Sequence, residues 1–374
     1  RVQNLDGGVN MTEMRITTDR GAAFQDMLHN VSVLIEQSQS EIRKVVNSSM
    51  VITYYCVGYF IVIFEQNGEN RAAYGKEALK NLSAILKDKY GRGWSVEQLT
   101  LCRKFYRTFC PNLVNTVYEI QKASDSIPIP KFGNLSWSHY LVLMRIEQLD
   151  ERSFYEIECE RQGWSVRQLQ RQVGSSLYER LALSRDKEEV MRLAREGQTI
   201  DKPTDILKNP LTLEFLGIQT HSVYSESDLE KAIISRISEF LLEMGRGFLF
   251  EARQKRLSFE EDHYYVDLVF YNRLLQCYVL IDLKTDKLKH QDIGQMQMYV
   301  NYYDRFVKQA FEKPTIGILL CRQKNDALVE LTLPADANIY AQQYALCLPD
   351  KKLLQRKLKE WIAEFEDAKH ETDL

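Results

Sequence analysis

The sequence lacks three features that would place a protein in a simple class. None of its seven cysteines stands at Cys-x-x-Cys spacing and their number is odd, which argues against a zinc ribbon or a disulfide framework. The net charge is only −3, so any surface that attracts nucleic acid must be local. Reduced thiols are the simplest interpretation, and the first residues contain no apolar signal-peptide core, so we expect a cytoplasmic protein.

Long hydrophobic runs are also scarce. The most apolar stretch, residues 50–64, has about fifteen largely apolar residues, whereas a membrane-spanning helix needs roughly 20. We therefore predict a buried core helix here and no membrane partner. Charged residues make up 27% of the chain and hydrophobic residues 44%, as in ordinary globular proteins, which argues against disorder.

The patterns that are present divide the chain into three zones. Residues 20–183 carry long helical periodicities, and we predict an all-helical domain. Residues 184–224, with Pro203 and Pro210, form a connecting segment. Residues 225–370 suggest the order helix, two strands, helix, two strands and a closing helix. We therefore predict an α/β protein (α+β overall) whose C-terminal domain has a mixed central sheet flanked by helices.

Two adjacent strand-like runs in the last zone, residues 263–271 and 276–284, contain unusual charges. Both runs are rich in β-branched and aromatic residues, and only a short loop separates them. In a hairpin centred on that loop, Asp267 lies opposite Asp282. Lys284 shares the face of Asp282, because side chains alternate along a strand. Two carboxylates and an amine should therefore converge on one patch of an apolar sheet.

This patch needs compensation for its charge. A lone carboxylate among apolar strands is costly unless it is paired or binds a metal, and two facing carboxylates repel. A divalent cation removes the repulsion, and oxygen ligands favour Mg²⁺ or Mn²⁺. Such a cation contacts phosphate and activates water, which Lys284 could orient or deprotonate. A structural Asp–Lys ion pair at a strand end is the alternative, and both interpretations stay open.

Asp267, followed fifteen residues later by Asp282-Leu283-Lys284, resembles the PD-(D/E)XK nuclease signature. Two departures are mild: Val266 stands where the motif has proline, and Asp282 stands where it often has glutamate. From about residue 24 onward the chain is similar to the YhcG family of bacterial PDDEXK-domain proteins. The segments that carry this similarity best are 209–217, 239–248, Arg253-Gln254 and Gly294-Gln295-Met296.

Two further elements fit the superfamily. Glu230 lies in an amphipathic helix where many members carry a metal-binding glutamate, and Gln295 and Tyr299 have the Gln-x-x-x-Tyr spacing that places both on one helix face. The resemblance implies Mg²⁺- or Mn²⁺-dependent cleavage of DNA phosphodiester bonds. The implied cation ligands are Glu230, Asp267, Asp282 and the backbone carbonyl of Leu283. The implied catalytic residues are Asp267, Asp282, Lys284, Glu230, Gln295 and Tyr299.

Several of these residues also have plainer interpretations. Ser227 and Glu230 fit a capping box, in which Glu230 only closes the start of a helix, although the two roles are compatible. Gln295 and Tyr299 fit an ordinary polar helix face. Arg253 and Gln254 fit either a phosphate contact or a solvated strand end. Each alternative stays open at this point.

The helical zone contains an internal repeat, Gly-Trp-Ser-Val-x-Gln-Leu, at residues 93–99 and 163–169. Each copy follows a helix-like segment and starts a capped helix, which is the outline of a helix-turn-helix unit. Basic side chains on the second helix could meet phosphates. The candidates are Arg103, Lys104 and Arg107 in the first copy, Arg167 and Arg171 in the second, and Arg253 in the C-terminal zone. Helix packing or protein contact without nucleic acid is the alternative.

We therefore expect a metal-dependent endonuclease that acts on DNA, with RNA left open, in genome defence or mobile-element processing. The alternative is a catalytically silent nucleic-acid-binding or assembly protein that acts through its helical domain. Because one site of this kind cuts one strand, cleavage of both strands would need a homodimer or two successive events.

Overall fold

The computed structural model divides into two compact units, Arg1–Arg145 and Ile146–Leu374. The residues that it describes are 20–66, 73–109, 130, 132–183, 187–208, 210–219, 222–259, 261–324, 326–334 and 337–360. Of the closing helix predicted over residues 351–367, residues 351–360 are helical and the rest lie outside the described ranges.

The first unit is helical, as predicted. Among its described residues the helices are α1 (Arg20–Gln66), α2 (Ala73–Tyr90), α3 (Val96–Phe109) and α5 (Trp137–Leu143). At Gly58, α1 approaches α3 so closely that an added Cβ would lie 2.1 Å from the carbonyl oxygen of Cys102, so no larger residue fits. Near this crossing the ring of Phe105 lies 5.9 Å from that of Tyr55 and 5.2 Å from that of Tyr140, which builds an aromatic core.

The C-terminal half of α1 has one buried and one exposed face. Val51 and Val62 are fully buried, whereas Ile52 is 38% and Phe60 is 60% exposed. By length and composition the segment Val45–Glu65 could cross a membrane, and 28% of its most apolar window is buried. The core helix predicted from the sequence is thus covered along one side.

The second unit joins several helices to a sheet. The helices that precede the sheet are α6 (Leu149–Gln162), α7 (Val166–Gly174), α8 (Leu177–Ala182) and α9 (Lys187–Glu196). Those that flank it are α10 (Glu226–Ser235), α11 (Ile237–Met244), α12 (His290–Tyr302) and α13 (Asp326–Thr332). Short helical turns cover Pro203–Ile206, Glu214–Leu216 and Tyr303–Val307.

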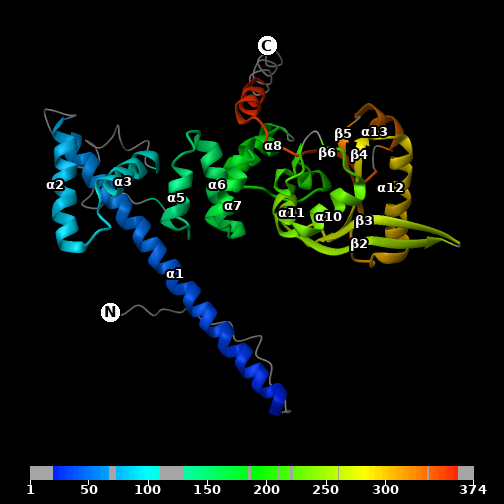
Figure 1. Cartoon of the computed structure of the whole chain (residues 1–374), viewed down its shortest axis with the longest axis horizontal. Helices are drawn as coiled ribbons and strands as arrows, with labels where there is room; N and C mark the ends of the chain where they lie inside the picture. Colours follow the sequence, from blue (N-terminus) through cyan, green and yellow to red (C-terminus); the bar gives the residue numbers. More distant parts are fainter. Residues whose placement is uncertain are drawn as a thin grey trace. The chain divides into compact units, whose positions relative to one another are not determined.

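The sheet has six strands in the order β1-β6-β5-β4-β3-β2. The strands are β1 (Leu211–Thr212), β2 (Phe248–Phe259), β3 (Asp262–Asn272), β4 (Cys277–Lys287), β5 (Ile316–Gln323) and β6 (Ile339–Ala345). β2, β3 and β4 are antiparallel, whereas β4, β5, β6 and β1 run parallel. α10 and α11 cover one face and α12 the other (Figure 1). The predicted mixed sheet flanked by helices is confirmed.

The hairpin of β3 and β4 has the predicted register. Leu268 pairs with Ile281, as expected for a turn centred between residues 274 and 275. Pairing between the two strands ends there, and β3 continues with β2 as a two-stranded ribbon as far as Phe259 and Asp262 (Figure 1). The predicted acids therefore lie where the wide part of the sheet gives way to the ribbon.

Two local features differ from the expectation. β2 is a strand that the sequence does not predict, because most of its side chains are exposed and no apolar alternation marks it. The helix expected to run on from Ser227 breaks at Arg236 (φ −125°) into α10 and α11. Ser225 caps α10 with Asp228 as its partner. The alternative interpretation, a cap by Ser227 and Glu230, is therefore wrong, and Glu230 takes no part in the cap.

Glu243 on α11 is fully buried and ties α7 and α8 to the sheet. Its carboxylate accepts hydrogen bonds from Arg180 (2.5 Å), Arg171 (3.3 Å) and the backbone N–H of Thr212 (3.0 Å). Its backbone carbonyl accepts one from the Lys208 ammonium. Burial alone would raise the pKa of Glu243, but Arg180 and Lys208 outweigh burial and lower it to about 2.

This network groups part of the predicted helical domain with the sheet. The sequence divides the chain after residue 183, whereas the contacts divide it after Arg145. The segment 184–224, expected as a connection, contributes β1, which pairs with β6. Residues 146–224 thus belong to the same compact unit as the sheet.

Replacing Glu243 with alanine should destabilise the second unit by about 3–5 kcal/mol, because the change leaves buried cations without their counter-ion. Urea unfolding measures the loss. Glu239→Ala is the matched control: Glu239 is on the same helix and pairs at 3.3 Å with the exposed Arg236. That loss should stay below about 1 kcal/mol. Equal losses in the two variants would contradict the role given to Glu243.

The contribution of Glu243 should also depend on pH. Because its pKa is lowered to about 2 in the folded protein, its stabilising effect is present above the unfolded pKa of about 4.3 and is lost as the pH falls towards 2. The stability gap between the parent and Glu243→Gln should therefore be full at pH 7 and shrink below about pH 4. A gap that stays constant from pH 7 to pH 3 in urea unfolding would argue against this assignment.

Candidate active site

The candidate site forms where β3 and β4 stop pairing. Asp267 directly precedes the paired part of β3, and its Oδ2 accepts a hydrogen bond of 2.7 Å from the backbone N–H of Leu283 on β4. In a continued antiparallel ladder a backbone carbonyl would accept that bond. The carboxylate replaces it, so Asp267 is held against β4 by its own side chain.

Asp282 and Lys284 form an ion pair on β4, with 2.7 Å between Lys284 Nζ and Asp282 Oδ2. Asp282 is only 3% exposed. Burial raises the pKa of its carboxyl to about 7 against the opposing effect of Lys284, and the nearby Asp267 adds to the rise. Burial would lower the pKa of Lys284, but Asp282 beside it raises that pKa above its ordinary value. The Asp–Lys ion pair, which the sequence leaves open as an alternative, is thus present. Asp267 is close enough to this pair to raise the pKa of Asp282.

Glu230 on α10 is linked to Asp267 through Gln254 on β2. The side-chain amide of Gln254 donates to Glu230 Oε2 at 2.5 Å and to Asp267 Oδ1 at 2.9 Å. Two predicted cation ligands therefore share one donor and lie close together. The sequence suggests a phosphate contact or a solvated strand end for Gln254, and its contact with the two acids is not among these interpretations. The signal that could have found it is its place in the Arg253-Gln254 segment that resembles the YhcG family.

Glu226 is a second residue that sequence reasoning missed. It lies one turn before Glu230 on α10, and its Oε2 is 3.6 Å from Lys284 Nζ. Burial raises the pKa of Glu226, Lys284 opposes the rise and Asp267 adds to it. The spacing of four residues to Glu230 was the signal that could have found it, because such pairs share a helix face.

Gln295 and Tyr299 on α12 contact each other, as their spacing predicts, through a hydrogen bond from the Gln295 amide to the Tyr299 hydroxyl. Tyr299 is fully buried, and its hydroxyl donates to the backbone carbonyl of Tyr265 at 2.9 Å. An exposed polar helix face is thus the wrong interpretation for Tyr299. The side chain fixes β3 two residues before Asp267.

The donor set fits a hard divalent cation, since Glu230, Asp267 and Asp282 offer only oxygen. Asp282 Oδ2 is also buried, and Lys284 Nζ lies 2.7 Å from it. The Leu283 carbonyl faces the same neighbour as its N–H, which is the side of Asp267. Among the described residues no three acidic, histidine or cysteine side chains form a ready-made metal cluster. Lys284 pairs with one of these acids, and Gln254 lies between the other two.

The six basic residues predicted to bind nucleic acid differ in exposure and in their ion pairs. Lys104, Arg167 and Arg253 are exposed. Arg103 and Arg107, which are 28% and 50% exposed, both pair with Glu65 of α1, at 2.6 and 3.0 Å. These pairs fix the second helix of the first repeat copy to α1.

Arg171 has a structural role in place of the predicted nucleic-acid contact. Its guanidinium pairs with Glu214 at 3.2 Å and Glu243 at 3.3 Å, and it lies 4.9 Å from the centre of the Phe215 ring. These contacts hold α7 against the sheet domain, and the side chain is only 16% exposed.

The two repeat copies each cap a helix as predicted. In the second copy Ser165 and Gln168 form a complete capping box at the start of α7. In the first copy the Ser95 hydroxyl accepts from the Gln98 N–H at 3.2 Å. Trp164 is buried and Trp94 packs on Tyr54, with 5.8 Å between ring centres, so both tryptophans anchor turns.

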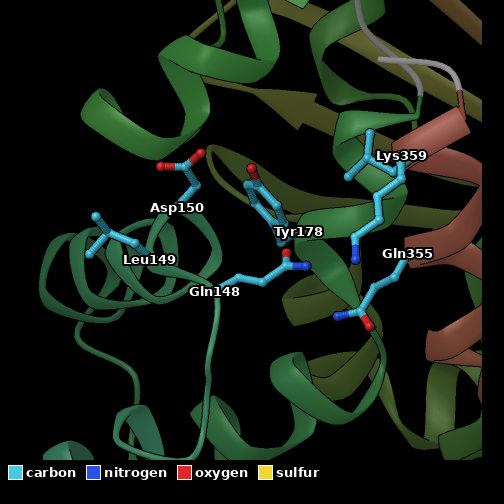
Figure 2. Close-up of a pocket in the computed structure, with 7 residues that line it drawn as sticks. Gln148, Leu149, Asp150, Tyr178, Gln355 and Lys359 are labelled. Atoms are coloured by element: carbon cyan, nitrogen blue, oxygen red, sulfur yellow. The ribbon is translucent and has the colours of Figure 1, made fainter. Parts of the chain in front are cut away.

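A hollow of about 330 Å³ lies in the second unit (Figure 2). It is lined by Gln148, Leu149, Asp150, Tyr178, Gln355, Leu358 and Lys359. None of the predicted site residues lines it. The candidate site is therefore identified by its chemistry and hydrogen bonds rather than by this cavity.

Two family models match the chain. The YhcG PDDEXK nuclease domain matches residues 204–359, and the DUF1016 N-terminal domain matches residues 30–180. Over 370 residues the chain is 35% identical to YhcG of Escherichia coli (strain K12), a protein described only as a candidate nuclease. The match covers 93% of this chain and 96% of that protein.

Two solved structures show weaker likenesses. One is a repair endonuclease from Pyrococcus abyssi (19% identity, TM-score 0.23, covering 34% of this chain and 50% of that one). The other is EndoMS in a complex with double-stranded DNA (14% identity, TM-score 0.24, covering 36% and 50%). Scores this low add nothing to the sequence match. With two matched domains and a relative aligned along nearly its whole length, the chain belongs to the YhcG family of PDDEXK nuclease-domain proteins.

Proposed function

We propose that the protein is an endonuclease that hydrolyses phosphodiester bonds of DNA with the help of Mg²⁺ or Mn²⁺. One observation carries the proposal: Asp267 and the Asp282–Lys284 pair meet where β3 and β4 separate, inside a PDDEXK nuclease domain. The family supports a nuclease, while the cation and the preference for DNA belong to the proposal.

Glu230, Asp267, Asp282 and the Leu283 carbonyl would hold the cation. When bound, it would supply a Lewis acid for the phosphate and a water of lowered pKa. Asp282 raises the pKa of Lys284 in the cation-free site, and the same carboxylate would be a ligand of the cation. Lys284 would act on the attacking water, by orienting or deprotonating it, or would offset charge on a phosphate oxygen.

Other residues position these groups. Tyr299 holds the β3 backbone through Tyr265, and Gln295 orients the Tyr299 hydroxyl. Glu226 gives Lys284 a second carboxylate partner, so the ammonium keeps a counter-charge if a cation takes over Asp282. The site thus has a counter-charge for Lys284 on α10 and positioning residues on α12.

Outside the acids, the exposed Lys104, Arg167 and Arg253 are the residues that would meet the phosphates of nucleic acid. The proposal includes a cytoplasmic role in genome defence or mobile-element processing. It also includes a homodimer wherever both strands are cut, since one such site cuts one strand.

Asp267→Asn and Lys284→Ala should each lower the rate of Mn²⁺-dependent DNA cleavage at least about 100-fold, because each removes charge that acts on the transition state. Plasmid, linear, branched and single-stranded DNA, with an RNA arm, form the substrate panel. Asp262→Asn is the matched control, since Asp262 is an exposed aspartate on the same strand.

Thermal unfolding of each variant separates lost chemistry from lost folding. Asp262→Asn should cut like the parent. If Lys284→Ala also cuts like the parent, the catalytic assignment fails. If the parent cuts nothing yet retains DNA in a gel-shift assay, the protein is a silent nucleic-acid-binding member of its family.

A further inference from the structure

Gln254 combines an unusual backbone with an unusual position. Its φ is +45°, a left-handed value that side-chain-bearing residues seldom adopt within a strand. A register shift between Phe250 and Ala252 precedes it. Such bulges and strained residues re-aim side chains and concentrate at functional sites. Strand geometry alone does not require this conformation. We attribute it to the contacts that the Gln254 side chain makes.

Those contacts are with two acids of the candidate site. Arg253 pairs with Leu268 and Lys255 with Val266, so Gln254 is the direct cross-strand neighbour of Asp267. The amide nitrogen donates to Asp267 at 2.9 Å and to Glu230 at 2.5 Å. A primary amide has two N–H groups, so both are used on carboxylates.

The nitrogen therefore binds two carboxylate oxygens, one on Glu230 and one on Asp267, that the proposed cation would also bind. A cation that takes both oxygens must displace the Gln254 amide from them. The third acid, Asp282, is neutralised by Lys284 at 2.7 Å. All three acids are thus compensated by donors of the chain itself. Without these donors, neighbouring carboxylates would repel each other.

We infer that Gln254 is a positioning residue whose amide holds the cation's place between Glu230 and Asp267 and turns away when the cation binds. The inference rests on the proposed function, because it concerns the same site. It makes the amide a competitor of the cation as well as a support for the empty site. Removing the amide should therefore tighten cation binding and weaken the cation-free fold.

The test is Mn²⁺ titration by calorimetry on the full chain, with the parent, Gln254→Ala and Gln254→Glu. Gln254→Ala should bind Mn²⁺ about 10-fold more tightly, the lower end of the roughly 10- to 100-fold effects of groups around metal ligands, and in the opposite direction because this amide competes with the cation. Gln254→Glu adds a further carboxylate beside Glu230 and Asp267 and should bind more tightly still. Lys255→Ala, an exposed neighbour on the same strand, should leave the affinity unchanged.

Thermal unfolding in EDTA and in Mn²⁺ gives a second readout that a merely structural role would not move. Both Gln254 variants should melt lower than the parent in EDTA and gain more than the parent from Mn²⁺. A purely structural glutamine would lower melting equally in both conditions. If Gln254→Ala does not fold, Gln254→Gly replaces it, since glycine adopts positive φ without strain.

The outcomes separate this inference from the proposed function. If the parent binds no Mn²⁺, or if Asp267→Asn binds as well as the parent, the proposed cation site is wrong and the inference falls with it. If the parent binds and Asp267→Asn does not, the site stands. In that case an unchanged or weaker affinity in Gln254→Ala overturns the inference alone.

Discussion

The separation of β3 from β4 is the constraint on which the site depends. Up to Leu268 and Ile281 the two strands exchange ordinary backbone hydrogen bonds. At the next position the carboxylate of Asp267 takes the N–H of Leu283, and the strands part. Because the Asp267 carboxylate takes the place of a backbone carbonyl, the Leu283 N–H keeps an acceptor although the two strands no longer pair. The acids lie at the point where the strands part, and the residues that contact them or hold their backbone come from α10, β2 and α12.

The core of this arrangement can be predicted from the sequence. The hairpin register follows from two short apolar runs around a tight loop, so the proximity of Asp267 and Asp282 needs no knowledge of the rest of the fold. The same holds for Gln295 and Tyr299, whose contact follows from helical spacing. Local periodicity determines these pairs, because each lies within one hairpin or one helix.

Residues that join through tertiary approach escape such reasoning. Gln254 reaches the acids only because β2 is a strand, and β2 has too little apolar alternation to be predicted. Glu226 meets Lys284 only because α10 docks beside β4. Arg171 looks like a phosphate-binding residue in its repeat, yet its partner Glu243 lies 72 residues away in the sequence. In each case the deciding partner lies in another element.

The buried carboxylate of Glu243 also decides how the chain can be divided. The nuclease-domain match begins at residue 204, after Arg171 and Arg180. A fragment cut at that boundary would retain Glu243 and Lys208 but lose both guanidinium groups that neutralise the carboxylate. A fragment that keeps both guanidinium groups must begin before Arg171, and the compact unit that contains them begins at Ile146. Swapping nuclease domains between relatives would require exchanging α7 and α8 along with the sheet.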